Sequence, residues 1–288
     1  MRTRSITSEV MSRLHPWGYR WGMDERTFGE LLRTWRDRRK LTQLDLSTRS
    51  GVSTRHLSFL ETGRSKPSRE MVLDLTEHLQ LPLRERNVLL TAAGFAAVYG
   101  RTPLDAPEME AVRSAIELVL SGHEPYPALA VDRYWNIVSM NQAAALLAAG
   151  IASEVMGSPP NVYRISLHPE GLAPRVVNFA EFAHHLLERL RHDTTVSADP
   201  ELTALLDEVE SYPTVRALPR PSFEHPGVVV PVRLRHPRGE LSLFTTIATF
   251  GTPVDVTVDE LALETFFPAD AATARRLNDL AVATDGAA

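Results

Sequence analysis

Apolar residues recur every three or four positions from residue 27 onward, the spacing that places them on one face of an α-helix. The first such helix begins near Thr27, and its opposite face carries several arginines. Its apolar positions are Phe28, Leu31, Leu32 and Trp35. The pattern predicts the first helix of a small helical bundle.

Residues 42–64 read as two shorter helices joined by a tight turn. Gly51 is expected to form the turn, because glycine adopts positive φ angles without strain. Ser53 is expected to cap the second helix by accepting a backbone N–H. The residues expected to face the core are Leu44, Leu57 and Leu60. This is the shape that places one helix in the major groove of DNA.

The second helix of this pair has an outward face that would contact the edges of DNA bases. Its outward residues are Thr54, Arg55, Ser58 and Phe59. Between residues 33 and 69 there are ten cations and three anions, and the net charge of −5 splits into +6 over residues 1–93 and −11 over residues 94–288. A basic patch around such a helix is typical of phosphate binding.

Two further helices complete the first domain. Pro67 and Ser68 open one of them, and the other runs from about Leu83 to Ala93, before Gly94. We therefore place an all-α, five-helix DNA-binding domain at residues 24–94. Residues 95–107 have the composition of a linker, with a hinge at 99–107, and a helix follows at 108–120.

The pattern beyond residue 127 changes to a mixture of strands and helices. A hairpin is predicted over 128–140 with its turn at 132–134, and Asn141 opens a helix rich in Ala and Leu. Further helices are expected at 178–192 and 200–211, and strands at 228–235, 240–250 and 261–267. This order predicts an α+β domain over residues 108–288, an antiparallel sheet covered by helices.

Composition excludes several classes of protein. The 288 residues contain no cysteine, which excludes disulfides and Cys-ligated zinc. No apolar run reaches the roughly 18 residues of a membrane helix, and the N-terminal residues lack the apolar segment of a secretory signal, so we expect a cytoplasmic protein without membrane contact. Glycine-rich phosphate loops and a G-x-S-x-G motif are absent, and we expect no enzyme. The histidines of residues 184–192 lack the converging ligands of a metal site, so no metal is predicted.

Residues 27–93 resemble the Xre/Cro-type helix-turn-helix of phage repressors, above all in the run from Gly51 to Ser68. The second half resembles the ligand-binding domain of MmyB-like transcription regulators, which has a PAS-like fold. The stretches that carry the second resemblance are 127–136, Asn141, His168-Pro169, 175–179 and 235–241. Residues 1–22 have no counterpart in this pattern, and Met23 is a candidate start, so we treat residues 1–23 as an N-terminal extension of no assigned function.

The first resemblance implies roles in DNA binding. Gln43 matches a residue that anchors its helix to phosphate, and Arg36 and Glu61 match a buried ion pair. The residues that match base contacts are Thr54, Arg55 and Phe59, and those that match phosphate contacts are Thr62, Arg64 and Lys66. Phe59 stands where phage repressors commonly have a polar residue. It either contacts a thymine methyl group or packs on a neighbouring helix.

The second resemblance implies a small apolar ligand, a fatty acid in some relatives, and no other cofactor. Arg175 and Asn178 are candidates for a carboxylate head group, with Asn141 in reserve, because a planar guanidinium and a helix N-terminus both suit a carboxylate. The candidate lining residues are Leu129, Val131, Ile137, Met140, Phe179, Leu186 and Phe244. Taken one by one these are typical core residues, so the pocket depends on the resemblance.

Two functions are compatible with this reading. The chain is either a ligand-responsive regulator that binds duplex DNA, or a DNA-binding protein whose second half only dimerises or docks a protein partner. A homodimer is expected in both cases, because two-fold regulators read half-sites about one helical turn apart. The helix at 108–120 and the C-terminal sheet are the expected dimer surfaces.

Overall fold

A computed structural model describes residues 26–197, 199–220 and 230–285. The chain forms two compact units: the helical unit, Met1–Leu79 with Leu89–Phe95, and the sheet unit, Gln80–Val88 with Ala96–Ala288. The predicted N-terminal extension and the start of the strand expected at 228–235 lie outside the described residues.

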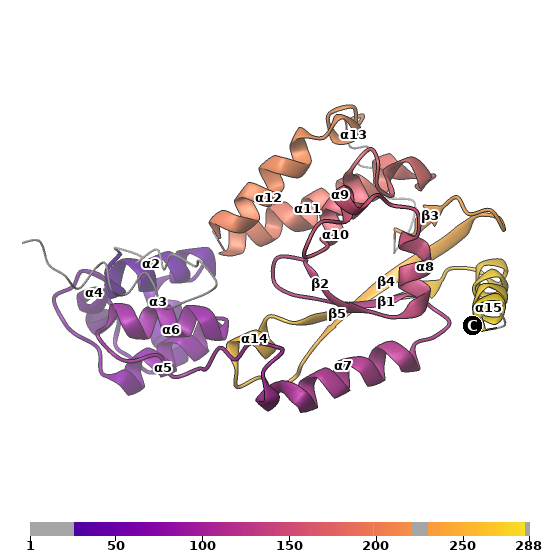
Figure 1. Ribbon diagram of the computed structural model, residues 1–288. Helices are drawn as coiled ribbons and strands as arrows, with labels where there is room; N and C mark the ends of the chain where they lie inside the picture. Colours follow the sequence, from indigo (N-terminus) through magenta and orange to yellow (C-terminus); the bar gives the residue numbers. More distant parts are fainter. Residues whose placement is uncertain (1–25, 198, 221–229, 286–288) are drawn as a thin grey trace, which may run out of the picture. The chain divides into compact units, whose positions relative to one another are not determined.

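Five helices form the predicted bundle (Figure 1). They are α2 (Phe28–Arg38), α3 (Gln43–Ser50), α4 (Thr54–Glu61), α5 (Arg69–His78) and α6 (Leu83–Ala92). Capping boxes begin the first two, with Thr27 and Glu30 at α2 and Thr42 and Asp45 at α3. Each box satisfies backbone N–H groups that have no partner inside the helix.

The turn between α3 and α4 forms as predicted. Gly51 has a φ of 71°, and the Ser53 side chain accepts a hydrogen bond from the backbone N–H of His56. Leu57 and Leu60 are buried, but Leu44 is 66% exposed, so its predicted core position was wrong. Leu46 is buried instead. Side chains two positions apart on a helix point to nearly opposite faces, so Leu44 and Leu46 cannot both face the core.

The sheet unit contains a five-stranded antiparallel sheet in the order β2-β1-β5-β4-β3, as the predicted α+β class requires. The strands are β1 (Ala128–Val131), β2 (Ile137–Met140), β3 (Val232–Leu234), β4 (Leu241–Thr249) and β5 (Ala262–Pro268). β5 is the central strand, with β1 on one side and β4 on the other.

Helices cover both faces of this sheet (Figure 1). On one face the α7 residues Ile116 and Leu120 pack against Ala128, Ala130 and Leu263. The opposite face packs against helices that include α8, α10 and α11. Side chains on a strand alternate between faces, so each strand contributes to both cores. The helices here are α7 (Glu110–Gly122), α8 (Gln142–Ala148), α10 (Val162–Leu167), α11 (Phe179–Ser197) and α12 (Pro200–Ser211).

The sequence reading missed several short elements and one longer helix. The short ones are α9 (Ser153–Met156), α10, η3 (Ala173–Arg175), α13 (Pro213–Arg216) and α14 (Val256–Asp259), whereas η2 (Pro107–Met109) begins the helix predicted at 108–120. A helix of one turn is too short to show a periodic pattern. The longer helix is α15 (Ala271–Asp285), in which small alanines occupy most apolar positions and leave a weak periodic signal.

The segment read as a hinge is held within the sheet unit. The Asn87 side chain bonds the backbone N–H and C=O of Tyr99, and the Asp255 carboxylate accepts hydrogen bonds from the backbone and hydroxyl of Thr102. Residues 99–102 are therefore anchored by side chains rather than left as a free linker.

Candidate DNA interface and ligand cavity

The outward side of α4 carries the predicted base-reading residues. Arg55 is exposed, and its guanidinium carbon lies 5.4 Å from the centre of the Phe59 ring. This contact orients Arg55 along the helix surface. Phe59 itself is half-buried, as are Thr54 and Ser58. Contact of any of them with a base remains a prediction.

The segment after α4 carries the predicted phosphate contacts. Gly63 has a φ of 70° and ends the helix, and Arg64 and Lys66 are exposed beyond it. Thr62 is also exposed, but its hydroxyl donates to the backbone carbonyl of Ser58 at 2.7 Å. The two cations can therefore approach a phosphate without breaking a bond that this structure contains.

A buried ion pair joins α2 to the end of α4, as the first resemblance implies. Arg36 Nε lies 2.6 Å from Glu61 Oε1, and Arg36 Nη2 lies 3.0 Å from Glu61 Oε2. The Glu61 side chain is only 4% exposed. Gln43, proposed as a phosphate anchor, donates to Glu61 Oε2 at 2.9 Å and so also braces the helix pair. The pair fixes the angle at which α4 is presented.

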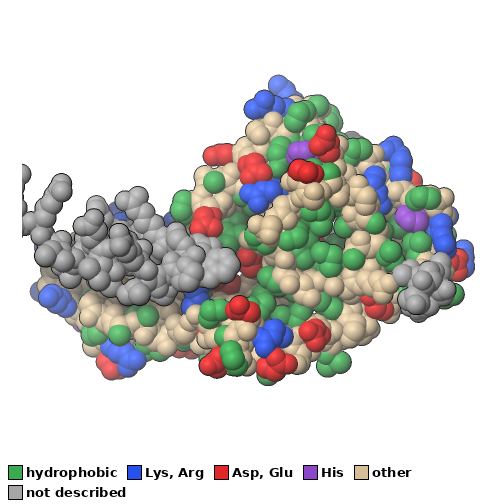
Figure 2. All heavy atoms as spheres, viewed as in Figure 1, with side chains coloured by type: hydrophobic (Ala, Val, Ile, Leu, Met, Phe, Trp, Pro, Cys, Tyr) green, Lys and Arg blue, Asp and Glu red, His purple; other side chains and the backbone are tan. Residues whose placement is uncertain are grey.

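An apolar cavity of about 100 Å³ lies against the sheet face that packs on α10 and α11, and we call it the sheet cavity. Figure 2 shows hydrophobic side chains gathered in the hollow between the sheet and the helices above it. Four predicted lining residues lie there: Leu129, Ile137, Met140 and Leu186. Other apolar lining residues include Ala144, Val162, Leu172, Phe182, Leu243 and Phe266, and the polar ones are Ser166 and Glu264.

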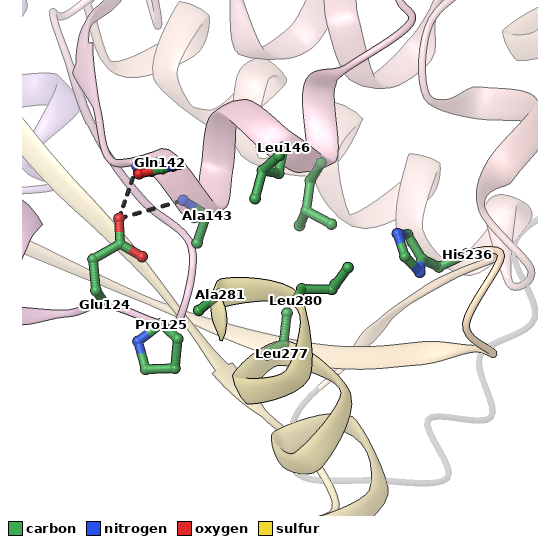
Figure 3. A pocket seen from close by; sticks show the side chains of 10 residues that line it. Glu124, Pro125, Gln142, Ala143, Leu146, His236, Leu277, Leu280 and Ala281 are labelled. Carbon is green, nitrogen blue, oxygen red and sulfur yellow. Dashed lines mark hydrogen bonds between the residues drawn. The ribbon is translucent and has the colours of Figure 1, made fainter. Parts of the chain in front are cut away.

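A second cavity, of about 170 Å³, lies between α8 and α15 and is shown in Figure 3. Its carboxylate belongs to Glu124, which accepts hydrogen bonds from the backbone N–H groups of Gln142 and Ala143 and so caps α8. Since this acid already has its partners, the sheet cavity is the better candidate for a ligand.

The chain matches two protein families. Residues 112–280 match the MmyB-like transcription regulator ligand binding domain, which covers more than half of the chain, and residues 27–89 match a helix-turn-helix domain. The chain belongs to the MmyB-like transcription regulators. Both matched families are those of transcription regulators rather than enzymes.

The remaining comparisons add little to this assignment. No curated protein matches this MmyB-like regulator. Among solved structures, an RNA-binding light-oxygen-voltage receptor matches with a TM-score of 0.25 and 13% identity, over 100% of this chain and 70% of that chain. A similarity this low has no bearing on the fold. Among the residues that the structure describes, no helix is both long and apolar enough to span a bilayer.

The three predicted polar ligand contacts of this MmyB-like regulator hold the fold together instead of lining the sheet cavity. Arg175 donates to the backbone carbonyl of Leu147 at 2.8 Å, at the end of α8. Asn178 bonds the backbone at the start of β3, where it donates to the Pro231 carbonyl and accepts from the backbone N–H of Arg233. These side chains meet backbone groups that a helix end and a strand edge leave without partners.

Asn141 has the same structural role at the start of α8. Its Oδ1 accepts from the backbone N–H groups of Ala128 and Ala144, and its Nδ2 donates to the carbonyls of Leu120 and Tyr126. All of its usual hydrogen-bonding capacity is thus committed to the backbone.

Three apolar candidates also lie outside the lining of the sheet cavity. Val131 and Phe179 pack in the neighbouring core. Phe244 stacks on Phe267 of β5, with ring centres 5.4 Å apart. Since its neighbour Leu243 lines the cavity, alternation along β4 turns Phe244 to the other face.

Sequence reasoning missed Glu264 and Arg189. Glu264 lies on β5 and is only 4% exposed, and burial raises the pKa of its carboxyl group, an effect that nearby Arg189 opposes. Arg189 of α11 lies 3.9 Å from the centre of the Trp135 ring and donates to the Tyr163 hydroxyl. Burial raises the pKa of Tyr163 to about 12, so this hydroxyl stays neutral. The available signal was Glu264 itself, the single charged residue of a mainly apolar β5.

The Arg36–Glu61 pair should dominate the stability of the helical unit. Glu61→Ala removes the bidentate partner of the buried Arg36 guanidinium and leaves it only the hydrogen bonds to Asp37 and to the Leu41 carbonyl, which should cost about 3 kcal/mol, the lower end of the range for breaking a buried pair. Hydrogen–deuterium exchange of the α2 and α4 amides measures this loss. The double variant Arg36→Met with Glu61→Leu should lose less stability than Glu61→Ala, because it leaves no buried charge unpaired. An equal or greater loss of stability in the double variant would contradict this account.

Proposed function

We propose that this regulator binds operator DNA through α4 and that an apolar ligand in the sheet cavity changes its affinity for DNA. The observation that carries the proposal is the presence, in one chain, of exposed cations on α4 and in the segment after it, and of a separate apolar cavity. Arg55, Arg64 and Lys66 supply the first, and the lining of the sheet cavity supplies the second.

The ligand we propose is a single apolar chain of moderate length, such as the chain of a fatty acid or of a fatty alcohol. A single water needs about 10–15 Å³, so a cavity of about 100 Å³ has room for roughly seven groups of that size. Each buried methylene contributes about 0.8 kcal/mol, so such a chain gains most of its affinity from burial. The proposal needs no further cofactor.

Arg55 and Lys66 should differ in what they contribute to DNA binding. Arg55→Ala should remove about 1–3 kcal/mol of discrimination between operator and mutated operator, because a bidentate contact with guanine is lost. Lys66→Ala should weaken binding to all sequences alike and reduce the salt dependence by about one phosphate contact. Fluorescence anisotropy with both DNAs at several salt concentrations measures each effect. Unchanged operator preference in Arg55→Ala would contradict the proposed docking.

Filling the sheet cavity should weaken ligand binding. Ala144 lines the cavity, whereas its neighbour Ala145 is exposed, so Ala144→Leu and Ala145→Leu form a matched pair. Native mass spectrometry of each variant with octanoic acid should show weaker binding in Ala144→Leu alone. If the purified chain carries no lipid and binds none, the alternative is favoured, in which the sheet unit only dimerises or docks a partner.

We also propose that the regulator is a homodimer and that α7 contributes to the interface. Leu118 is 73% exposed on α7, although Ile116 and Leu120 of the same helix are buried against the sheet. Leu118→Glu should shift the dimer toward monomer in light scattering at micromolar concentration, because an interface would bury the new charge. Ala204→Glu, on an exposed position of α12, is the control. A wild-type monomer, with and without DNA, would argue against a dimer.

A further inference from the structure

Glu264 is a charged residue on the apolar side of the sheet. It pairs with Leu129 in the β1–β5 register, so both side chains lie on the same face, and both line the sheet cavity. Phe266, two residues along β5, lines the cavity as well. Among the residues that line this cavity, Glu264 is the one with an ionisable side chain, and Ser166 is the other polar residue.

Arg189, the cation paired with Glu264, does not satisfy the hydrogen-bonding capacity of the Glu264 carboxyl group. Arg189 Nη1 lies 3.8 Å from Glu264 Oε1, which is longer than a hydrogen bond. Glu264 Oε2 and Arg189 Nη2 are buried, and neither has a hydrogen-bond partner among the described residues. A buried polar atom without a partner is costly, so a purely structural pair would be expected to close this gap.

We infer that Glu264 accepts a hydrogen bond from the polar end of the ligand, which is an apolar chain that ends in a neutral donor such as a hydroxyl group or a primary amide. This inference rests on the proposed ligand-binding function. The chain would occupy the apolar part of the cavity, and its O–H or N–H would meet Oε2.

A carboxylate head group fits this end of the cavity poorly. A carboxylate has no N–H or O–H to donate to Glu264 Oε2, and a second anion beside an ionised Glu264 would be repelled. Arg175, the cation expected to bind a carboxylate, already donates to the carbonyl of Leu147. The charge arrangement therefore favours a neutral head group.

Titration calorimetry of the full-length protein at neutral pH tests the inference with three ligands that share a chain. Octan-1-ol has a donor, 1-methoxyoctane lacks it, and octanoate carries a negative charge. Octan-1-ol should bind roughly tenfold tighter than 1-methoxyoctane, as one additional hydrogen bond implies, and octanoate should bind more weakly than octan-1-ol.

Variants of Glu264 separate ligand recognition from structure. Glu264→Met should abolish the preference for octan-1-ol over 1-methoxyoctane, whereas Glu264→Gln, which keeps an accepting oxygen and nearly the same shape, should retain part of it. Glu188→Met, at an exposed position beside Arg189, should retain all of it. Should Glu264→Met fail to fold, the wild-type ligand series and Glu264→Gln decide the question.

The possible failures are distinguishable. Equal binding of all three ligands, or tightest binding of octanoate, would overturn the role of Glu264 and leave the proposed apolar ligand standing. Absence of binding for all three ligands to the wild-type chain would remove the proposed ligand function, and this inference with it.

Discussion

The position of β5 at the centre of the sheet is the constraint on which the sheet unit depends. β5 pairs with β1 along one edge and with β4 along the other, so its register fixes which side chains of three strands share a face. Leu263 thereby joins the core under α7, while Glu264 and Phe266 join the cavity lining. A slip of one residue would exchange the two faces and place an acid in the α7 core.

The elements with strong periodic or alternating patterns could be predicted from the sequence. The five helices α2 to α6, the β1–β2 hairpin, α11, α12 and the long strand β4 all lie close to their expected positions. The pattern could not place Leu44 correctly, because a helix as short as α3 allows two registers of its apolar face. One-turn helices such as α10 depend on tertiary contacts, which local patterns do not report.

The candidate site was harder to predict than the fold, and the reason is physical. Arg175, Asn178 and Asn141 are polar residues beside helix ends and strands, where backbone groups need partners, and each side chain meets that need. The side chains of polar residues at such boundaries more often bond to the backbone than remain available for a ligand. The apolar candidates Leu129 and Leu186 lie where expected because hydrophobicity and alternation determine the face they occupy.

Two arginine–glutamate pairs of this chain, each with a buried carboxylate, show how a structural pair differs from an incomplete one. In Arg36–Glu61 both carboxylate oxygens accept bonds of 3.0 Å or less from the guanidinium, and Gln43 adds another. In Arg189–Glu264 the approach is 3.8 Å, and one atom on each side has no partner among the described residues. The free-energy cost of desolvating two charges is offset only when the ions are well aligned and all of their hydrogen bonds are made. The first pair meets that condition within the protein, whereas the second does not, and the donor of the proposed ligand would supply the bond that Glu264 Oε2 lacks.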